Sequence, residues 1–202
     1  MNKIIDEAVE TSWRVESHGS LYIFLNAPVY RGKFFYWRLD ALNPWSLLNI
    51  DVSEDGYITT IEVITYNRPI ENIPEEVKSG DRVRERGSIE LDTSQWMQRN
   101  HPSALERSKF IENSESFHIQ MDELRLRIEL LRCRIARIVW TSNSLYFELN
   151  ELNEICGIVL TDFIGQERKI FVRKMQSSAI WCIFSDSLKI FKNVFSQFVK
   201  MT

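Results

Sequence analysis

The stretch SLLNIDVSEDGYITTIEVITY, residues 46–66, places Asp55-Gly56 between two apolar runs. Asp-Gly suits the two positive-φ positions of a type I′ turn, so the stretch predicts a β-hairpin with a two-residue loop. Such a loop determines which residues of the two strands face each other. We expect one face of the hairpin to be apolar core, formed by the pairs Leu48 and Val63, Ile50 and Ile61, and Val52 and Thr59. The other face is polar and pairs Asn49 with Glu62 and Asp51 with Thr60.

Further strand patterns precede this hairpin. SLYIFLN (residues 20–26) and KFFYWRLD (residues 33–40) are rich in aromatic and β-branched residues, which strands favour. Together with the hairpin they predict a β-meander in the first part of the chain.

A second β-rich region covers residues 117–175. A turn at residues 142–143 would pair Ile138 with Phe147 and Arg137 with Glu148. Residues 155–161 and 169–175 are expected to extend this second meander, with a turn between them at residues 165–166. Met121–Ile138 also has apolar residues spaced by three and four, as in an amphipathic helix. We favour strands there, because a second apolar set interrupts the helical stripe and the β-rich RIVW follows directly.

Residues 69–116 differ in character from the two β-rich regions. They carry Pro, Gly and many charges, with DRVRERG at the centre, so they predict a long charged connection holding one short strand at residues 88–91. Near the C-terminus, a cap at Ser185 or Asp186 begins a helix whose phenylalanines form one stripe.

The fold class expected from these patterns is α+β, predominantly antiparallel β. Two β-meander regions form it, with a C-terminal amphipathic helix packed on the sheet. Residues 1–202 make either a single compact domain or two intimately packed β-rich halves, about 1–68 and 117–202, joined by the charged connection 69–116.

Bulk composition excludes several classes of protein. A net charge of −3 and a pI near 5.7 argue against a nucleic-acid binder, which needs clustered Lys and Arg. The apolar segment of residues 179–199 contains charged residues, so no membrane span is expected. MNKIIDEAVE lacks the apolar run of a signal peptide, and we therefore expect a cytoplasmic protein. Cys133, Cys156 and Cys182 lie in apolar segments and are expected to be buried free thiols.

Motifs of catalysis are missing from the sequence. The three histidines are isolated from one another and from the cysteines, so no metal site is expected. The chain contains neither GxGxxG nor a P-loop, and it has no GxSxG elbow, so we expect no cofactor and no enzymatic activity. The chain therefore reads as a non-enzymatic protein-binding module.

Five residues are the candidates for partner binding. Four lie on the polar face of the hairpin, and Trp96 stands in the polar setting SQWMQRNHP, where an indole is hard to bury. The five candidates are Asn49, Asp51, Thr60, Glu62 and Trp96.

LLNIDVSEDGYITTIEVITY, and more faintly LYFELNELNEICGIVLTD, resembles a strand–DG–strand element of cytosolic immunity proteins. These proteins neutralise bacterial contact-dependent or other polymorphic toxins. The resemblance covers about a quarter of the chain and implies tight binding to one cognate toxin domain, often a basic nuclease, through this protein's acidic groups. Two alternatives stay open. One is a hydrolase that uses Asp51, Glu62 and a histidine brought in by folding, and the other is a β-rich protein with a small-ligand cavity between the two meanders.

Overall fold

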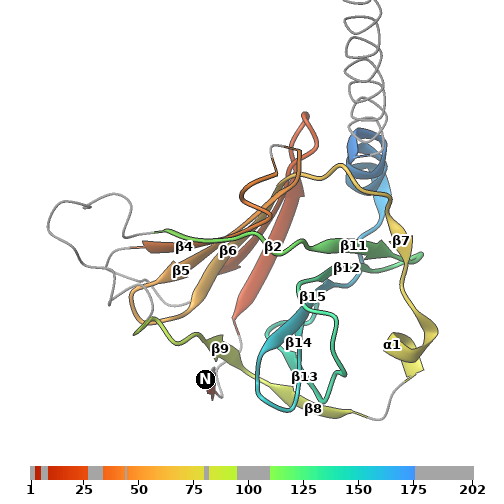
Figure 1. The fold of residues 1–202 in the computed structure, drawn as a ribbon. Helices are drawn as coiled ribbons and strands as arrows, with labels where there is room; N and C mark the ends of the chain where they lie inside the picture. Colours follow the sequence, from red (N-terminus) through yellow and green to blue (C-terminus); the bar gives the residue numbers. More distant parts are fainter. Residues whose placement is uncertain are drawn as a thin grey trace, which may run out of the picture.

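Two mixed β-sheets face each other across a shared core in the computed structural model of the chain (Figure 1). The structure describes residues 3–5, 9–26, 34–43, 45–79, 82–94 and 110–175. These residues are mostly strand, with two short helices, so the α+β, mostly β class is confirmed. Three strand pairs are parallel, so the sheets are not strictly antiparallel as expected. No helix within the described ranges has the length and apolar character needed to cross a bilayer.

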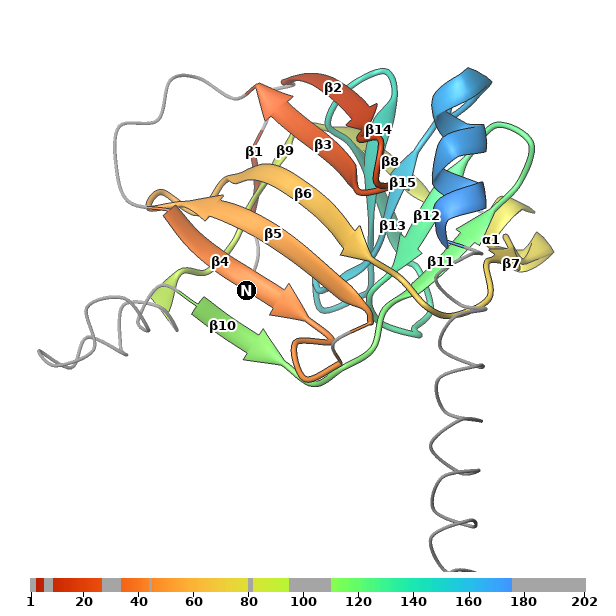
Figure 2. The same cartoon turned by 90° about the horizontal axis from the view of Figure 1, so that it is seen from above.

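The first sheet has six strands in the order β10-β4-β5-β6-β3-β2 (Figure 2). Its strands, in chain order, are β2 (Glu10–Val15), β3 (Leu21–Asn26), β4 (Phe34–Leu39), β5 (Leu47–Ser53), β6 (Ile58–Thr65) and β10 (Phe110–Asn113). β4, β5 and β6 follow one another as expected, but β3 pairs with β6 rather than with β4. The predicted meander is therefore wrong at its first strand, whose neighbour comes from a distant part of the sequence.

The second sheet has seven strands in the order β7-β11-β12-β15-β14-β13-β8. They are β7 (Glu71–Asn72), β8 (Val83–Arg86), β11 (His118–Met121), β12 (Leu126–Glu129), β13 (Arg137–Trp140), β14 (Leu145–Leu149) and β15 (Ile155–Leu160). Met121–Ile138 is thus strand and loop, in agreement with the strand interpretation. Residues 165–175 form a helix, so the expected strand at residues 169–175 is wrong. The predicted helix beginning near Ser185 lies outside the described residues.

The charged connection joins all the sheets. β7 and β8 form the two edges of the seven-stranded sheet, and β10 forms an edge of the six-stranded one. β9 (Ser88–Glu90) pairs with β1 (Lys3–Ile5), which agrees with the predicted short strand. The expectation of only one strand in this connection is wrong, because β7, β8 and β10 also lie in it and pair along sheet edges. Between β7 and β8 the chain passes α1 (Glu75–Ser79), on the side of the seven-stranded sheet away from the six-stranded one (Figures 1 and 2).

The Asp55-Gly56 hairpin forms with a three-residue loop rather than two. The Ser53 amide donates to the Tyr57 carbonyl at 2.8 Å, and Gly56 alone of the loop residues has a positive φ, +89°. The three-residue loop shifts the register by one, so that Val52 pairs with Ile58 instead of Thr59. A bulge between Asp51 and Val52 then restores the predicted register. The four other predicted pairs are present.

The second hairpin differs from its prediction by one residue. Ile138 pairs with Glu148 and Val139 with Phe147, because the loop again has three residues, with Thr141 and Leu145 as its flanks. A shift of one residue moves side chains to the opposite face. Val139 therefore joins the core, while Glu148 lies on the opposite face without Arg137 as its cross-strand partner.

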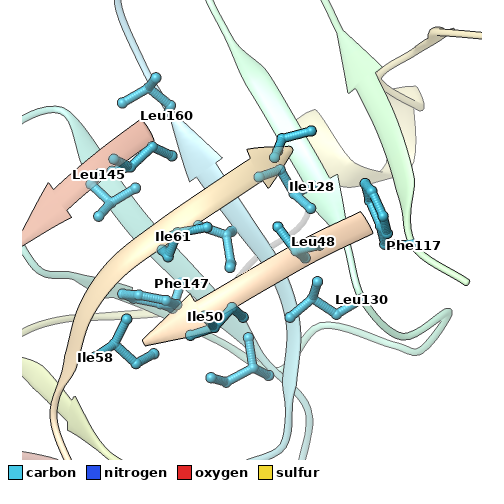
Figure 3. Close-up of a cluster of buried hydrophobic side chains, with 14 of the residues drawn as sticks. Leu48, Ile50, Ile58, Ile61, Phe117, Ile128, Leu130, Leu145, Phe147 and Leu160 are labelled. Atoms are coloured by element: carbon cyan, nitrogen blue, oxygen red, sulfur yellow. The ribbon is translucent and has the colours of Figure 1, made fainter. Parts of the chain in front are cut away.

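One continuous cluster of buried side chains fills the space between the sheets. It draws on both β-rich regions, and Figure 3 shows Leu48, Ile50 and Ile61 of the first hairpin beside Phe147 and Leu160. Leu48, Ile50, Val52, Ile61 and Val63 are fully buried, as the pattern predicted, whereas Thr59 is only partly buried and Ile58 takes its place opposite Val52. The two regions thus share a core.

Cys133 and Cys156 form a disulfide, which corrects the expectation of free thiols at these positions. Cys156 is the second residue of the buried strand β15, and Cys133 lies in the loop after β12. The spacing of the cysteines along the sequence does not indicate this disulfide. It can form because β12 and β15 lie side by side, and only the folded sheet places them so. Cys182 lies outside the described residues.

The face of the seven-stranded sheet opposite the core buries charge. Arg127 is 2% exposed and its Nε donates to Glu148 Oε2 at 2.7 Å. Its Nη1 donates to Gln120 Oε1 at 2.7 Å and to Glu129 Oε1 at 2.9 Å. Burial raises the pKa of the Glu148 carboxyl. One guanidinium therefore holds two carboxylates and an amide inside the protein.

Gly56→Ala is expected to destabilise the fold more than Gly165→Ala. Both glycines have a positive φ, which costs an alanine about 1 kcal/mol. A Cβ at Gly56 would also lie 2.4 Å from the Leu91 carbonyl, whereas one at Gly165 meets nothing within 4 Å. Urea unfolding should give a loss of about 2 kcal/mol or more for Gly56→Ala and about 1 kcal/mol for Gly165→Ala. Equal losses would contradict the close contact at Gly56.

Arg127→Met is expected to cost about 3–5 kcal/mol of unfolding free energy, because it leaves buried carboxylates without their cation. The matched control is Arg125→Met, which breaks the partly exposed ion pair with Asp122 and should cost about 1 kcal/mol or less. Chemical denaturation of both variants measures the difference. A cost for Arg127→Met no larger than for the control would show that the buried cluster is not stabilised through Arg127.

Candidate functional site

The outward face of the six-stranded sheet carries two rows of polar and aromatic side chains. Cross-strand pairing determines both rows, since residues directly opposite each other point to the same face. One row contains Arg14, Tyr22, Glu62, Asn49, Arg38 and Glu112. The second row contains Ser12, Phe24, Thr60, Asp51 and Tyr36. We call these two rows the outer face.

Asn49 and Asp51 form the centre of the outer face. Asn49 Nδ2 donates to Asp51 Oδ1 at 2.6 Å, which orients the amide. Asn49 is only 8% exposed, and its Oδ1 has no hydrogen-bond partner among the described residues. Burial raises the pKa of the Asp51 carboxyl, and the charge of Glu62 raises it further. The Asn49 amide oxygen and the carboxylates of Asp51 and Glu62 therefore lie on neighbouring positions of the outer face.

Tyr22 supports Glu62 from the neighbouring strand. A hydrogen bond to the Glu62 carboxylate raises the pKa of Tyr22 to about 12, so the phenol stays protonated and donates. Tyr22 and Phe24 stack with their ring planes at 7° and their centroids 6.0 Å apart. The Arg14 guanidinium lies over both rings, 5.3 Å from the Tyr22 centroid and 5.1 Å from that of Phe24.

The two arginines of the outer face already have acidic partners. Arg14 pairs with Glu16 at 3.0 Å, and Arg38 pairs with Glu112 at 3.5 Å. Asp51 and Glu62 accept hydrogen bonds from an amide and a phenol, which are neutral, and the charge of Arg38 opposes the upward shift in the pKa of Asp51 without cancelling it. The middle of the outer face is consequently negative.

The structure brings together four of the five predicted site residues. Asn49, Asp51, Thr60 and Glu62 are cross-strand or near neighbours on β5 and β6. Asn49 is buried rather than exposed as expected, because it lies on the central strand β5 with Arg38 of β4 and Glu62 of β6 on its two sides. Trp96 lies outside the described residues.

Sequence reasoning missed the outer-face residues of β2, β3 and β4. The alternation in SLYIFLN separates Tyr22 and Phe24 from the buried leucines and could have indicated this face. No local signal could show that β3 lies beside β6 and so places Tyr22 against Glu62.

Two described histidines lie apart from β5 and β6 in the fold. His18 is in the turn between β2 and β3, and His118 is on β11 of the other sheet. His101 lies outside the described residues. Within those ranges, no three His, Cys, Asp or Glu side chains are grouped so as to hold a metal ion.

Comparison of the sequence with models of known protein families, and with curated proteins, finds no match. The outer face is therefore assigned a role from its geometry. The resemblance to immunity proteins stays a prediction.

Asp51→Asn is expected to be at least as stable as the wild type at pH 7, because it keeps an acceptor for Asn49 and removes a half-buried charge. The folded-state pKa of Asp51 lies above its ordinary value, so the folded protein binds the proton more tightly than the unfolded chain. Wild-type stability should therefore fall relative to Asp51→Asn as the pH rises from 3.8 through that raised pKa. Urea unfolding of both proteins between pH 4 and 7 measures this, and a difference that does not change with pH would contradict it.

Proposed function

We propose that the chain is a non-enzymatic protein-binding module, and that the outer face binds a partner rich in Lys and Arg. The observation that carries this proposal is the pair of partly exposed carboxylates, Asp51 and Glu62, which accept hydrogen bonds from the neutral Asn49 amide and Tyr22 phenol. Such groups call for hydrogen-bond donors with positive charge. Tyr22, Phe24 and Tyr36 add aromatic surface, which protein interfaces favour.

The partner class in this proposal is a basic toxin domain, and the chain acts as its immunity protein. Binding would place the toxin's cationic surface against the negative centre of the outer face. The net charge of −3 supports association with a basic partner. An immunity role of this kind also implies that the chain acts in the cytoplasm. The Cys133–Cys156 disulfide weighs against that location, because thiols of cytoplasmic proteins are usually kept reduced.

The hydrolase alternative has less support than the small-ligand alternative. A hydrolase using Asp51 and Glu62 would need a histidine beside them, and the two described histidines are on β11 and in the β2–β3 turn. A small-ligand function is favoured by a cavity of about 460 Å³ that residues of both sheets line. That cavity lies on the core side of β4, so it is separate from the outer face.

The test is co-purification with the toxin-like product of the reading frame next to this gene. Glu62→Lys should weaken binding at least about thirtyfold, because placing like charges together costs ~2 kcal/mol or more. Glu167→Lys makes the same change at an exposed position of the helix over residues 165–175 and should leave binding unchanged. Affinity should also rise with pH as Asp51 ionises, and Asp51→Asn should remove this dependence.

Two results would overturn parts of the proposal. Absence of a toxin-like neighbour, or failure of its product to bind the wild-type chain, would remove the immunity role. Binding that tolerates Glu62→Lys as well as it tolerates Glu167→Lys would remove the outer face as the interface.

A further inference from the structure

A cavity of about 460 Å³ opens between the β4–β10 edge of the six-stranded sheet and the ends of β12 and β15, two central strands of the seven-stranded sheet. Its apolar lining comes from both sheets and the segments that follow their strands: Trp37, Leu39, Ile111, Leu130 and Ile155. Leu39 is fully buried, and Figure 3 shows Leu130 beside the core residues Leu48 and Ile50. Cavities that hold small molecules have about 300–1,000 Å³ and mostly apolar walls. The cavity has the size and floor of a small-ligand site.

The same cavity carries charge of only one sign among its described lining residues. Asp92, Glu115 and Glu154 contribute carboxylates, and the described lining contains neither Lys nor Arg. Asn150 Nδ2 donates to Glu154 Oε2 at 2.7 Å, which positions this carboxylate. Hydrogen bonds from Ser94 lower the pKa of the Asp92 carboxyl. An apolar floor with anionic groups beside it is complementary to an amphipathic cation.

Covalent and backbone bonds hold the walls of the cavity together. The amides of Leu130 and Leu131 both donate to the Cys156 carbonyl, at 2.8 and 3.1 Å. The Cys133–Cys156 disulfide joins the same two segments. Because these walls are fixed before a ligand arrives, binding loses little free energy in ordering them.

We propose that this cavity binds a small organic cation with an aromatic or aliphatic body. The body packs against Trp37 and the surrounding leucine and isoleucine side chains, and the ammonium group lies among the carboxylates. This site is independent of the outer face, since Trp37 points to the opposite side of β4 from Tyr36 and Arg38.

Three probes with one indole body test the charge preference: tryptamine, tryptophol and indole-3-acetate. Titrations followed by amide chemical shifts should perturb Leu130, Leu131 and Ile155. Tryptamine should bind at least about threefold more tightly than tryptophol, as expected for exposed ion pairs, and indole-3-acetate should bind most weakly. Equal affinities, the reverse order, or shifts at other residues with none at the cavity would overturn the proposal, as would failure of all three probes to bind.

Leu131→Lys places an ammonium group at the mouth of the cavity, at a position that is 40% exposed and tolerates a charge. It should weaken tryptamine binding at least about threefold. The matched control is Leu124→Lys, which is 55% exposed and does not line this cavity. Retained tryptamine affinity in Leu131→Lys, or equal losses in both variants, would contradict the site. Circular dichroism verifies that both variants are folded.

Discussion

The apolar row of the β5–β6 hairpin can be buried only if a second layer of structure covers it. Leu48, Ile50, Ile61 and Val63 are fully buried, and a single hairpin cannot cover such a row by itself. The seven-stranded sheet supplies the second layer, so strands far apart in sequence meet in one core. Residues 69–116 contribute edge strands to both large sheets, and this connection therefore belongs to the architecture. The close contact of Gly56 with Leu91 joins the tip of the hairpin to the same connection.

The two sheets use their second faces in opposite ways. On the seven-stranded sheet, the Arg127 cluster is buried, and the segment with α1 passes on that side. On the six-stranded sheet, Arg14 and Glu112 are exposed and most other members of the two rows are partly so. Charged groups that are buried and paired hold a structure together only when every partner is present. Partly exposed carboxylates such as Asp51 and Glu62 can instead take a partner from outside, and this difference in exposure is the physical basis for proposing recognition at the outer face.

Alternation along β4 separates the two proposed sites. Tyr36 and Arg38 point to the outer face, whereas Trp37 and Leu39 line the cavity between the sheets. Both sites carry carboxylates, but the two sites differ in shape. The outer face is a sheet surface suited to a macromolecule, and the cavity has the volume of a small-molecule site. An experiment can therefore contradict one of the two proposals and leave the other unaffected.

Local elements could be predicted from the residue pattern alone, because alternation and turn residues act over a few residues. The pattern indicated the apolar row of the first hairpin, four of its five cross-strand pairs and the neighbours Asn49, Asp51, Thr60 and Glu62. Register beyond the turns required the tertiary structure. In both hairpins a three-residue loop shifts the strand pairing by one residue. Packing against the core decides whether a bulge restores the predicted register, as beside Val52, or whether the shift remains, as at Glu148. The pairings of Tyr22 with Glu62, Arg127 with Glu148 and Cys133 with Cys156 also belong to the tertiary structure. Each joins strands or loops whose adjacency follows from sheet order, and sheet order is set by the burial of whole faces.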